Sequence, residues 1–409
     1  GGPVLWNHLT TKDFVTYENR GPALFPDSDI DSSGAYSGSA FMHDGKVHYF
    51  YTGNVKHFDR DDYDYVLTGR DQNQIHMVTD NPDELGEKRL AVGPLDYPDD
   101  IGTHVRDPKI LEHDGVYYMV LGARTKDDRG CVLVFTSCDL ESWKYATRIE
   151  LDEKFGFMWE CPDLFELDGE LVLVCCPQGV PAEGWRYHNP HQCVWFCIEA
   201  DWEAPSFKVV DQGMPPMVDA GFDFYAPQSF EDNEGRRLMI GWGGCPDATV
   251  ENPTVERGWQ CALTVPRQLS MHDGKLCQWP VRELEKLRGD CAHVHAGETV
   301  AEPGRLFDAV ISCERAKTVE LEIREGVTVR FADGKLTLDM GDEGYGREVR
   351  LVETGELHDL RVLSDTTLVE IFANGGETAL TSRTYSPAAS TIRLLVEGTA
   401  SMKFYRLAK

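Results

Sequence analysis

The sequence predicts an all-β protein built from repeated antiparallel hairpins. In four stretches, small or polar residues open an apolar strand, an Asp-Gly or Glu-Gly pair turns the chain, and an aromatic or β-branched strand returns. Helical patterns are scarce between them. The stretches are "SGSAFMHDGKVHYFYTG", "RDPKILEHDGVYYMVLGAR", "ECPDLFELDGELVLVCC" and "APQSFEDNEGRRLMIGWGG", with turn glycines Gly45, Gly115, Gly169 and Gly235.

The spacing of these hairpins indicates a β-propeller. The turn glycines lie 54 to 70 residues apart, which leaves room for two outer strands in each repeat and matches four-stranded blades. In a propeller the first strand of each blade lines the central channel. We therefore expect Ser37, Asp107, Glu160 and the neighbourhood of Tyr225, which open the repeats, to surround one pocket.

A different pattern follows the repeats. In "WPVRELEKLRG", Val281, Leu284 and Leu287 recur at helical spacing, which predicts a short helical linker over residues 280–290 after a first domain at 1–279. From 291 to 409 the chain consists of short apolar runs separated by Gly, Asp and Asn. Evenly spaced short strands of this kind predict a β-sandwich domain.

Composition narrows the class of partner. The 409 residues are 41% hydrophobic and carry a formal net charge of -29, so the chain can bury a large core and repels phosphate backbones and anionic lipids. No apolar run approaches the roughly 20 residues that span a bilayer. We therefore expect neither a nucleic acid nor a membrane as partner.

The twelve cysteines favour a reducing compartment. Cys175 and Cys176 are adjacent, and most of the others lie scattered in apolar strand-like runs rather than at the spacing of a disulfide framework. We therefore expect a cytoplasmic protein. The sequence opens "GGPVLWNHLTT" without a signal peptide or a methionine, so an upstream segment is compatible with it.

One carboxylate has unusual neighbours. In "FGFMWECPDLFELDGELVLVCC", Glu160 lies between Trp159 and Cys161 at the start of a strongly apolar run. A carboxyl group that loses hydration there has a raised pKa and can serve as a general acid near neutral pH. The alternative is a strand-end glutamate that faces water, or one in a structural network.

Eight motifs in order resemble glycoside hydrolase family 32, the group of invertases, sucrose-6-phosphate hydrolases and fructanases. They are "WNHLTTKDFVTYENRGPALFP", "YSGSA", "RDPKI", "ECPDLF", "RYHNPHQ", "GFDFYAPQSF", "IGWGG" and "LVEIFANGGE…TSRTY". The resemblance implies a five-bladed β-propeller followed by a C-terminal β-sandwich. It also implies cofactor-free hydrolysis of β-fructofuranosyl bonds in sucrose, sucrose 6-phosphate or short fructans, with retained configuration.

The resemblance also implies roles for individual residues. In the family's R-D-P motif, Asp107 is the transition-state stabiliser that holds fructosyl hydroxyls, and Arg106 keeps it ionised and binds hydroxyls. In the E-C motif, Glu160 is the acid/base, kept protonated by burial against Trp159. The further substrate-binding residues that we expect are Tyr36, Ser37, Cys161, Tyr225 and Trp242.

These residue types suit glycosidic cleavage. The reaction passes through an oxocarbenium-like state, so a carboxylic acid must protonate the leaving oxygen while a carboxylate attacks or shields the anomeric carbon. Once a nucleophile is glycosylated, the same acid can act as base on water. Hydrogen bonds from Asp107 to hydroxyls would tighten as charge builds on the ring.

One family motif has no match. The nucleophilic aspartate belongs to an N-terminal W-x-N-D-P-N-G motif, and N-D-P-N-G occurs nowhere in the sequence. We expect the sequence to be a piece of a longer enzyme, with an incomplete first blade. The alternative is a family member that binds fructosides without hydrolysing them. A relative from families 43 or 68 is a further alternative, which the sandwich and E-C-P-D disfavour.

We expect no metal. The acidic run Asp27, Asp29 and Asp31 lacks the glycine and glutamate of a calcium loop, and the His and Cys residues of "RYHNPHQCVWFC" have no zinc-ligand spacing. That stretch matches a family pattern whose positions imply a pocket wall at Tyr187, Asn189 and Gln192. The predicted partner is a small carbohydrate, and the sequence leaves substrate length and the choice of monomer or homodimer open.

Overall fold

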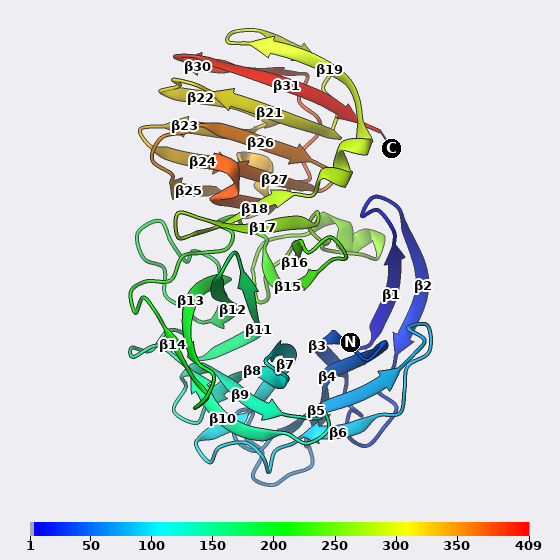
Figure 1. Ribbon diagram of the computed structural model, residues 1–409. Coiled ribbons are helices and arrows are strands. Elements are labelled where there is room, and N and C mark those ends of the chain that lie inside the picture. The colour runs from blue at the N-terminus through cyan, green and yellow to red at the C-terminus, as the bar shows by residue number, and fades with distance from the viewer. Residues whose placement is uncertain (1–3, 409) are drawn as a thin grey trace. The chain divides into compact units, whose positions relative to one another are not determined.

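The computed structural model describes residues 4–408, whose regular secondary structure consists almost entirely of strands (Figure 1). Two compact units are present. The first comprises residues up to Lys12, Thr16–Val180 and Val194–Pro216, and the second comprises Asp13–Val15, Pro181–Cys193 and the chain from Met217 onward. No helix within residues 4–408 is long and apolar enough to cross a membrane.

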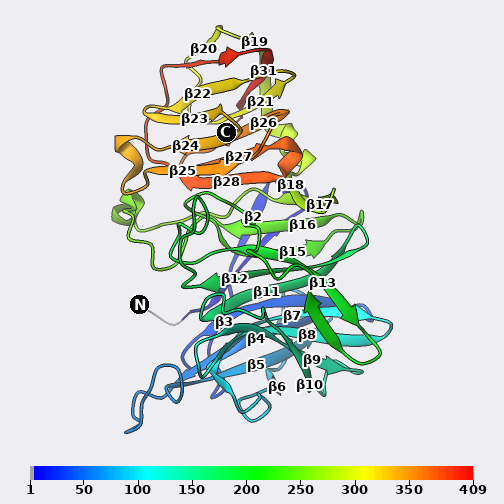
Figure 2. The same ribbon diagram turned by 90° about the vertical axis from the view of Figure 1, so that its left-hand side faces the viewer.

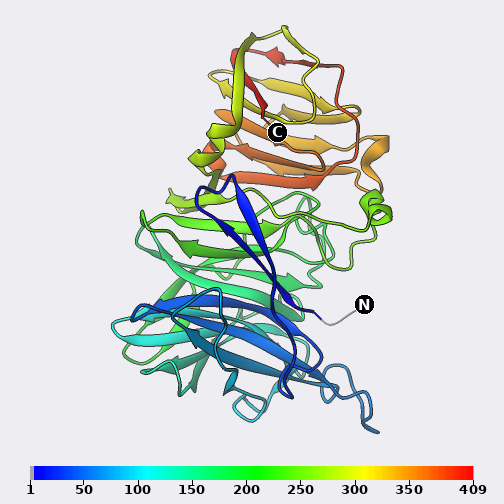
Figure 3. The same cartoon turned by 90° about the vertical axis from the view of Figure 1, so that its right-hand side faces the viewer.

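The first unit contains a two-stranded ribbon and three four-stranded antiparallel sheets, each a meander in chain order. The ribbon is seen lengthwise in Figure 3 and consists of β1 (Trp6–Thr11) and β2 (Tyr17–Leu24). The first sheet contains β3 (Ala35–His43), β4 (Lys46–Lys56), β5 (Arg70–Thr79) and β6 (Arg89–Val92). The second contains β7 (Ile101–His113), β8 (Val116–Thr125), β9 (Gly130–Ser137) and β10 (Lys144–Ile149). The third contains β11 (Met158–Leu167), β12 (Glu170–Gln178), β13 (Val194–Asp201) and β14 (Ser206–Val209).

The second unit begins with a fourth four-stranded sheet and continues with two larger sheets (Figure 2). The four strands are β15 (Tyr225–Glu231), β16 (Arg237–Trp242), β17 (Arg267–His272) and β18 (Lys275–Pro280). The six-stranded sheet has the order β19 (Arg288–His295), β31 (Ala400–Leu407), β21 (Phe307–Cys313), β26 (Asp359–Ser364), β27 (Leu368–Ala373) and β28 (Thr378–Arg383). The five-stranded sheet has the order β25 (Val349–Glu353), β24 (Lys335–Asp339), β23 (Val327–Ala332), β22 (Thr318–Arg324) and β30 (Leu395–Glu397). The remaining elements are β20 (Thr299–Ala301), β29 (Thr391–Arg393) and the 3-10 helices η1 (Pro253–Arg257), η2 (Arg282–Leu287), η3 (Asp342–Gly344) and η4 (Asn374–Gly376).

The Asp-Gly turns form as the sequence predicts. In the hairpins β3–β4, β7–β8 and β11–β12 both turn residues have positive φ, which is the type I′ geometry that matches the twist of the strands. The fourth hairpin, β15–β16, differs. Its longer turn at 232–236 is closed by hydrogen bonds to Asp232, and Gly235 takes positive φ while Glu234 does not.

The predicted linker is helical but not α-helical. Residues Arg282–Leu287 form the 3-10 helix η2, and β19 begins directly after it at Arg288. A spacing of three residues, as between Val281, Leu284 and Leu287, places side chains on one face of a 3-10 helix. Val281 and Leu284 are buried in an apolar cluster with Leu238 of β16.

The two larger sheets share one apolar core. Strands of both contribute alternate side chains to it, such as Leu321 and Val329 from the five-stranded sheet and Ile311 and Val362 from the six-stranded sheet. Two facing sheets with interdigitating alternate side chains are the arrangement of a β-sandwich.

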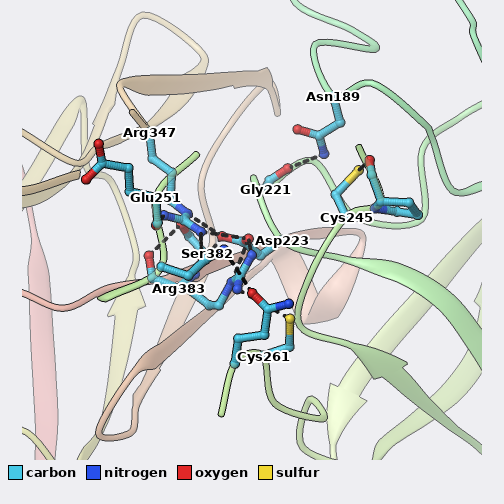
Figure 4. A network of polar contacts seen from close by, with 12 residues as sticks. Asn189, Gly221, Asp223, Cys245, Glu251, Cys261, Arg347, Ser382 and Arg383 are labelled. Carbon is cyan, nitrogen blue, oxygen red and sulfur yellow. Dashed lines mark hydrogen bonds and ion pairs between the residues drawn. The ribbon is translucent and has the colours of Figure 1, made fainter. Parts of the chain in front are cut away.

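Within the second unit, buried ion pairs join the segment before β15 to the larger sheets. Asp223 accepts hydrogen bonds from the guanidinium groups of Arg347 and Arg383 and from the Arg383 amide (Figure 4). Asp219 similarly accepts from Arg267 and from the hydroxyl and amide of Thr381. Since each charge is paired and hydrogen-bonded, these contacts can persist without water.

Candidate active site

The candidate residues lie at a bulge that recurs in the first strand of each four-stranded sheet. Pairing slips by one residue at each site, because two residues of the first strand lie opposite one residue of its partner; this re-aims side chains and leaves backbone groups outside the ladder. The slips fall between Ala35 and Gly38 in β3, Arg106 and Lys109 in β7, Glu160 and Asp163 in β11, and Tyr225 and Gln228 in β15.

Three of these bulges share one backbone conformation. The residue before proline takes positive φ in each case: 65° at Asp107, 49° at Cys161 and 47° at Ala226. Positive φ costs free energy for a residue with a side chain, so it persists where the surroundings impose it. The recurring x-Pro pairs are the sequence sign of this bulge.

Asp107 is buried and is held by its neighbours' backbone and hydroxyl groups. Its Oδ2 accepts a hydrogen bond from the Cys161 amide at 2.8 Å, and its own amide donates to Thr52 Oγ1 at 3.0 Å. Only 4% of the residue is exposed. Burial raises the pKa of Asp107 to about 6, against the lowering effect of Arg106 and with a further raising contribution from the charge of Glu160.

Both carboxylate oxygens of Glu160 accept hydrogen bonds. Arg106 donates to Oε1 from Nε at 2.9 Å and from Nη2 at 2.6 Å, and Gln178 donates to Oε2 at 2.8 Å. The side chain keeps 16% of its surface exposed, so a ligand can reach it. The geometry brings Arg106, Asp107, Glu160 and Cys161 together, as the sequence predicts.

Arg106 acts on both carboxylates. We expected it to keep Asp107 ionised, and its charge does act to lower the pKa of Asp107, but burial outweighs this effect, while the guanidinium itself donates to Glu160. Neighbouring residues of a strand point to opposite faces unless a bulge intervenes, and this bulge begins directly after Arg106. A motif of adjacent letters does not reveal which side chains meet.

The Trp159 side chain has partners of its own. Its indole is buried, donates to the Phe155 carbonyl at 2.7 Å and stacks on Phe196. Gly122 of β8 allows this strand to approach closely, since a Cβ on Gly122 would lie 2.1 Å from the Trp159 carbonyl oxygen. Trp159 therefore fixes the position of β11, and Arg106 and Gln178 set the surroundings of the Glu160 carboxylate.

Cys161 binds Asp107 with both its amide and its thiol. The amide donates to Asp107 Oδ2 at 2.8 Å, and the hydrogen bonds of both groups act to lower the pKa of Asp107. The thiol is buried, and a hydrogen bond with Cys176 and burial hold its own pKa well above the usual range. We expected Cys161 to bind the substrate; in the structure it positions Asp107. No disulfide joins any of the twelve cysteines, all of which lie within the described range.

Sequence reasoning did not identify several polar residues that contact Arg106. The Arg106 Nη1 atom is 3.1 Å from His104 Nδ1 and 3.3 Å from Gln72 Oε1. Burial and the charge of Arg106 lower the pKa of His104 to about 3, so the ring is neutral. Gln72 also accepts a hydrogen bond from the Val105 amide. The available signal was polar side chains inside apolar strands, as in "RDQNQIH" and "FYTGN".

The other predicted subsite residues are divided between the units. Tyr36 is half-buried and Ser37 exposed at the β3 bulge, and β3 is tied to β7 by a hydrogen bond from Ser39 Oγ to the Pro108 carbonyl at 2.7 Å. Tyr225 and Trp242 lie in the second unit, directly opposite each other in the β15–β16 register.

The segments considered for metals have other partners. Asp31 accepts hydrogen bonds from Tyr51 at 2.7 Å and Lys88 at 2.6 Å, and His191 lies 3.0 Å from an oxygen of Asp247. Asn189 donates to the Gly221 carbonyl at 2.9 Å (Figure 4). Over residues 4–408 no group of three or more His, Cys, Asp or Glu side chains is arranged to hold a metal ion.

Comparisons with known proteins agree with this geometry. Residues 1–280 match the profile of the glycosyl hydrolases family 32 N-terminal domain, and residues 285–407 match that of the glycosyl hydrolases family 32 C-terminal domain. The chain is 36% identical over 399 residues to the sucrose-6-phosphate hydrolase of Bacillus subtilis, covering 93% of this chain and 80% of that protein. It is 37% identical over 403 residues to the enzyme of the same name from Salmonella typhimurium, covering 94% and 80%.

Solved structures show the same likeness. The sucrose-6-phosphate hydrolase from Lactobacillus gasseri superposes with a TM-score of 0.88 at 27% identity, covering 100% of this chain and 86% of that one. The GH32 β-fructofuranosidase BmSUC1 of Bombyx mori gives a TM-score of 0.84 at 26% identity, with the same coverage. On the two profile matches, which together span nearly the whole sequence, the chain belongs to glycosyl hydrolase family 32.

Proposed function

We propose that this protein is a β-fructofuranosidase that hydrolyses the β-fructofuranosyl bond of sucrose, sucrose 6-phosphate or short fructans with retention of configuration. The observation that carries the proposal is the pairing of two carboxylates through Arg106 and the Cys161 amide. Glu160 is accessible and held at both oxygens, and Asp107 is buried beside it. The names of the relatives point to the same reaction class.

Glu160 is the acid/base in this proposal. Because Oε1 accepts both donors of Arg106, we assign the transferable proton to Oε2, beside Gln178. Protonation of the leaving oxygen by Glu160 allows the glycosidic bond to break, and the resulting carboxylate is stabilised by the guanidinium that already binds it. Retention requires that the fructosyl carbon bond first to a carboxylate nucleophile as the leaving group departs, and that water then displace that carboxylate while Glu160 takes a proton from the water. Residues 1–409 contain no match to the motif that carries this nucleophile, so the step assigned to this chain is the proton transfer by Glu160.

Asp107 binds the fructosyl ring. Its Oδ2 is directed by the Cys161 amide, so the carboxylate keeps one orientation while it accepts hydroxyl hydrogen bonds. Tyr36, Ser37, Tyr225 and Trp242 are proposed as further contacts of the sugar. The family's nucleophile motif has no counterpart within residues 1–409, and the proposal for this chain concerns the other two carboxylates.

We propose the family architecture for the whole chain: a five-bladed propeller over residues 1–279, a helical linker at 280–290 and a β-sandwich at 291–409. Four four-stranded meanders in chain order and one shared core between two later sheets support it. We also propose a cytoplasmic location, because a chain with so many buried thiols suits a reducing compartment.

Hydrolysis followed by NMR tests the proposal. The purified protein is incubated with sucrose, sucrose 6-phosphate and 1-kestose, and the first-formed fructose anomer is recorded before mutarotation. Release of β-fructofuranose from at least one substrate is the expected result. Binding of these sugars without any release of fructose would favour the alternative, a family member that binds fructosides without turnover.

A further inference from the structure

The segment between β4 and β5 exposes several aromatic side chains beside the candidate active site. We refer to residues 57–69, "HFDRDDYDYVLTG", as the aromatic loop. Phe58 is 73% exposed, Tyr65 54% and Tyr63 42%, and the rings of Phe58 and Tyr63 stack with centroids 5.9 Å apart. Exposed aromatic side chains grouped in this way are typical of binding surfaces.

The aromatic loop has a defined internal structure. Asp64 Oδ1 accepts hydrogen bonds from the amides of Val66 and Leu67 at 2.8 Å, and the Asp64 amide donates to Thr68 Oγ1 at 2.8 Å. The Thr68 and Gly69 amides both donate to the Asp64 carbonyl. A loop with this much internal hydrogen bonding presents its side chains in fixed positions, which lowers the entropy cost of binding.

The loop rests on the strand that carries Arg106 and Asp107. The Val66 carbonyl accepts hydrogen bonds from the amide and the hydroxyl of Thr103, at 2.8 and 2.9 Å. The Tyr65 carbonyl lies 3.0 Å from His104 Nε2, and the Tyr65 ring packs 4.8 Å from the His104 ring. On the other side, the Arg70 guanidinium lies 4.3 Å from the Tyr65 ring centroid.

Two side chains connect Tyr65 to the acid/base. Arginine only donates hydrogen bonds, so His104 Nδ1 accepts from Arg106 and the neutral ring carries its proton on Nε2, which donates to the Tyr65 carbonyl. Arg106 in turn binds Glu160. Tyr65 is therefore linked to Glu160 through His104 and Arg106, and its exposed ring lies against the His104 ring.

The charge of the loop constrains what can lie on it. Four of its thirteen residues are aspartates, against one arginine. Arg60 is occupied by both oxygens of Asp62 at 2.8 Å. Of the nearby cations, Arg70 is buried beneath Tyr65, and Lys56 lies over Phe58 with its Nζ 5.7 Å from the ring centroid. Carboxylates accept hydrogen bonds from sugar hydroxyls and repel a phosphate dianion.

We propose that the aromatic loop binds the leaving-group sugar of the fructoside and selects an uncharged sugar over a phosphorylated one. This inference rests on the proposed function, since it assigns a place to the group that Glu160 protonates. Phosphate on the glucosyl unit of sucrose 6-phosphate would face the aspartates, whereas the glucosyl unit of sucrose, or a further fructosyl unit, would pack its ring on the aromatic faces.

Steady-state kinetics on matched substrates tests the aromatic contact. The substrates are sucrose and methyl β-fructofuranoside, which share the fructosyl group and differ in the leaving group. Tyr65→Ala is expected to raise KM for sucrose about three- to tenfold more than KM for methyl β-fructofuranoside. The double variant Phe58→Ala/Tyr63→Ala probes the outer rings without touching the contact with His104. Leu95→Ala, a change at a fully exposed apolar residue elsewhere in the first unit, is the control. Equal effects on the two substrates in both loop variants would overturn the proposal.

Neutralising two aspartates of the aromatic loop tests its selectivity between sucrose and sucrose 6-phosphate. Asp59→Asn/Asp61→Asn is expected to raise kcat/KM for sucrose 6-phosphate relative to sucrose about three- to tenfold at low ionic strength, with a smaller effect in salt. The control Asp290→Asn/Glu314→Gln removes the same charge from exposed positions in the second unit. A wild-type preference for sucrose 6-phosphate over sucrose, or no change of the ratio in the loop variant, would overturn the charge argument.

The two proposals fail separately. If the wild-type protein hydrolyses none of these substrates, the proposed function fails, and calorimetric titration with sucrose and with fructose then tests the loop. Tighter binding of sucrose than of fructose, lost in Tyr65→Ala, would support the loop as a sugar-binding surface. The same affinity change for both sugars would contradict it.

Discussion

Arg106 donates two hydrogen bonds to a single oxygen of Glu160, from Nε at 2.9 Å and from Nη2 at 2.6 Å. Gln72 and His104 contact the third nitrogen, Nη1, of the same guanidinium. The guanidinium is thereby fixed in orientation, and it fixes the carboxylate in turn. The position of the Glu160 carboxylate therefore depends on a planar, multiply bonded cation rather than on charge alone.

Replacing Arg106 by lysine tests this dependence. Lysine keeps the charge but cannot reproduce the fork or reach all three partners, so we expect kcat/KM for sucrose to fall by about 10²-fold. The matched control is Arg124→Lys, because Arg124 binds one oxygen of the half-exposed Asp128 with the same two atoms, at 2.9 and 2.6 Å. A similar small loss in both variants would show that the charge at Arg106 suffices.

Neutralising Asp107 should stabilise the fold while it removes activity. Burial raises the pKa of Asp107 from 3.8 to about 6, so ionisation of this group disfavours the folded state. Its contribution to stability is fully present below pH 3.8 and is lost as the pH rises through about 6. Asp107→Asn escapes that loss, and we expect its free energy of unfolding to exceed the wild-type value by about 2 to 3 kcal/mol at pH 8.

Urea denaturation at two pH values measures this effect. The gain of Asp107→Asn over the wild type should shrink as the pH falls through about 6 and disappear well below pH 3.8, where the wild-type group is largely protonated in both states. Asp128→Asn, at an exposed ion pair, should show no such pH-dependent gain. Destabilisation by Asp107→Asn at pH 8 would mean that Arg106 and the Cys161 amide outweigh the cost of burying the charge.

Cys161 offers a test of backbone positioning. Cys161→Ala removes the hydrogen bond of the thiol to Asp107 but keeps that of the amide, so it should retain kcat/KM for sucrose within about fivefold. Cys161→Val should lose far more, because a β-branched side chain disfavours the φ of 49° that directs the amide toward Asp107. Equal losses in the alanine and valine variants would instead assign the role to the thiol.

Gly122 should not tolerate even a methyl group. A Cβ there would lie 2.1 Å from the Trp159 carbonyl oxygen, so Gly122→Ala must separate β8 from β11 and move Glu160. We expect destabilisation of about 1 to 3 kcal/mol and a fall in kcat. Gly93→Ala, where the nearest atom would be a Leu90 methyl carbon at 3.4 Å, is the control. Thermal unfolding and steady-state rates measure both effects.

Local structure could be predicted from the sequence where it depends on short-range chemistry. The Asp-Gly pairs at Gly45, Gly115 and Gly169 form tight hairpins because only a few residue types accept positive φ at both turn positions. The longer turn before Gly235 escaped this reasoning, since "DNEG" fits several turn lengths. Asp107 and Glu160 could be named as candidates because the motifs order them along the chain.

The contacts within the site could not be predicted, because they depend on the shared bulge. A slip of one residue after Arg106 and after Glu160 decides that the arginine meets the glutamate and that the Cys161 amide meets Asp107. Gln178 reaches the site from the far end of β12, eighteen residues after the glutamate that it binds. Such side-chain pairings depend on the register in which the strands pair, and a sequence motif does not specify that register.

The most direct test of the account is the hydrolysis of sucrose by Glu160→Gln beside Glu166→Gln, an exposed glutamate on the same strand. The account predicts that kcat of Glu160→Gln falls by about 10²- to 10⁴-fold with KM nearly unchanged, and that a nitrophenyl β-fructofuranoside, whose leaving group needs no proton, is affected least. Glu166→Gln should behave as the wild type. Sucrose hydrolysis at the wild-type rate by Glu160→Gln would contradict the assignment of Glu160 as the acid.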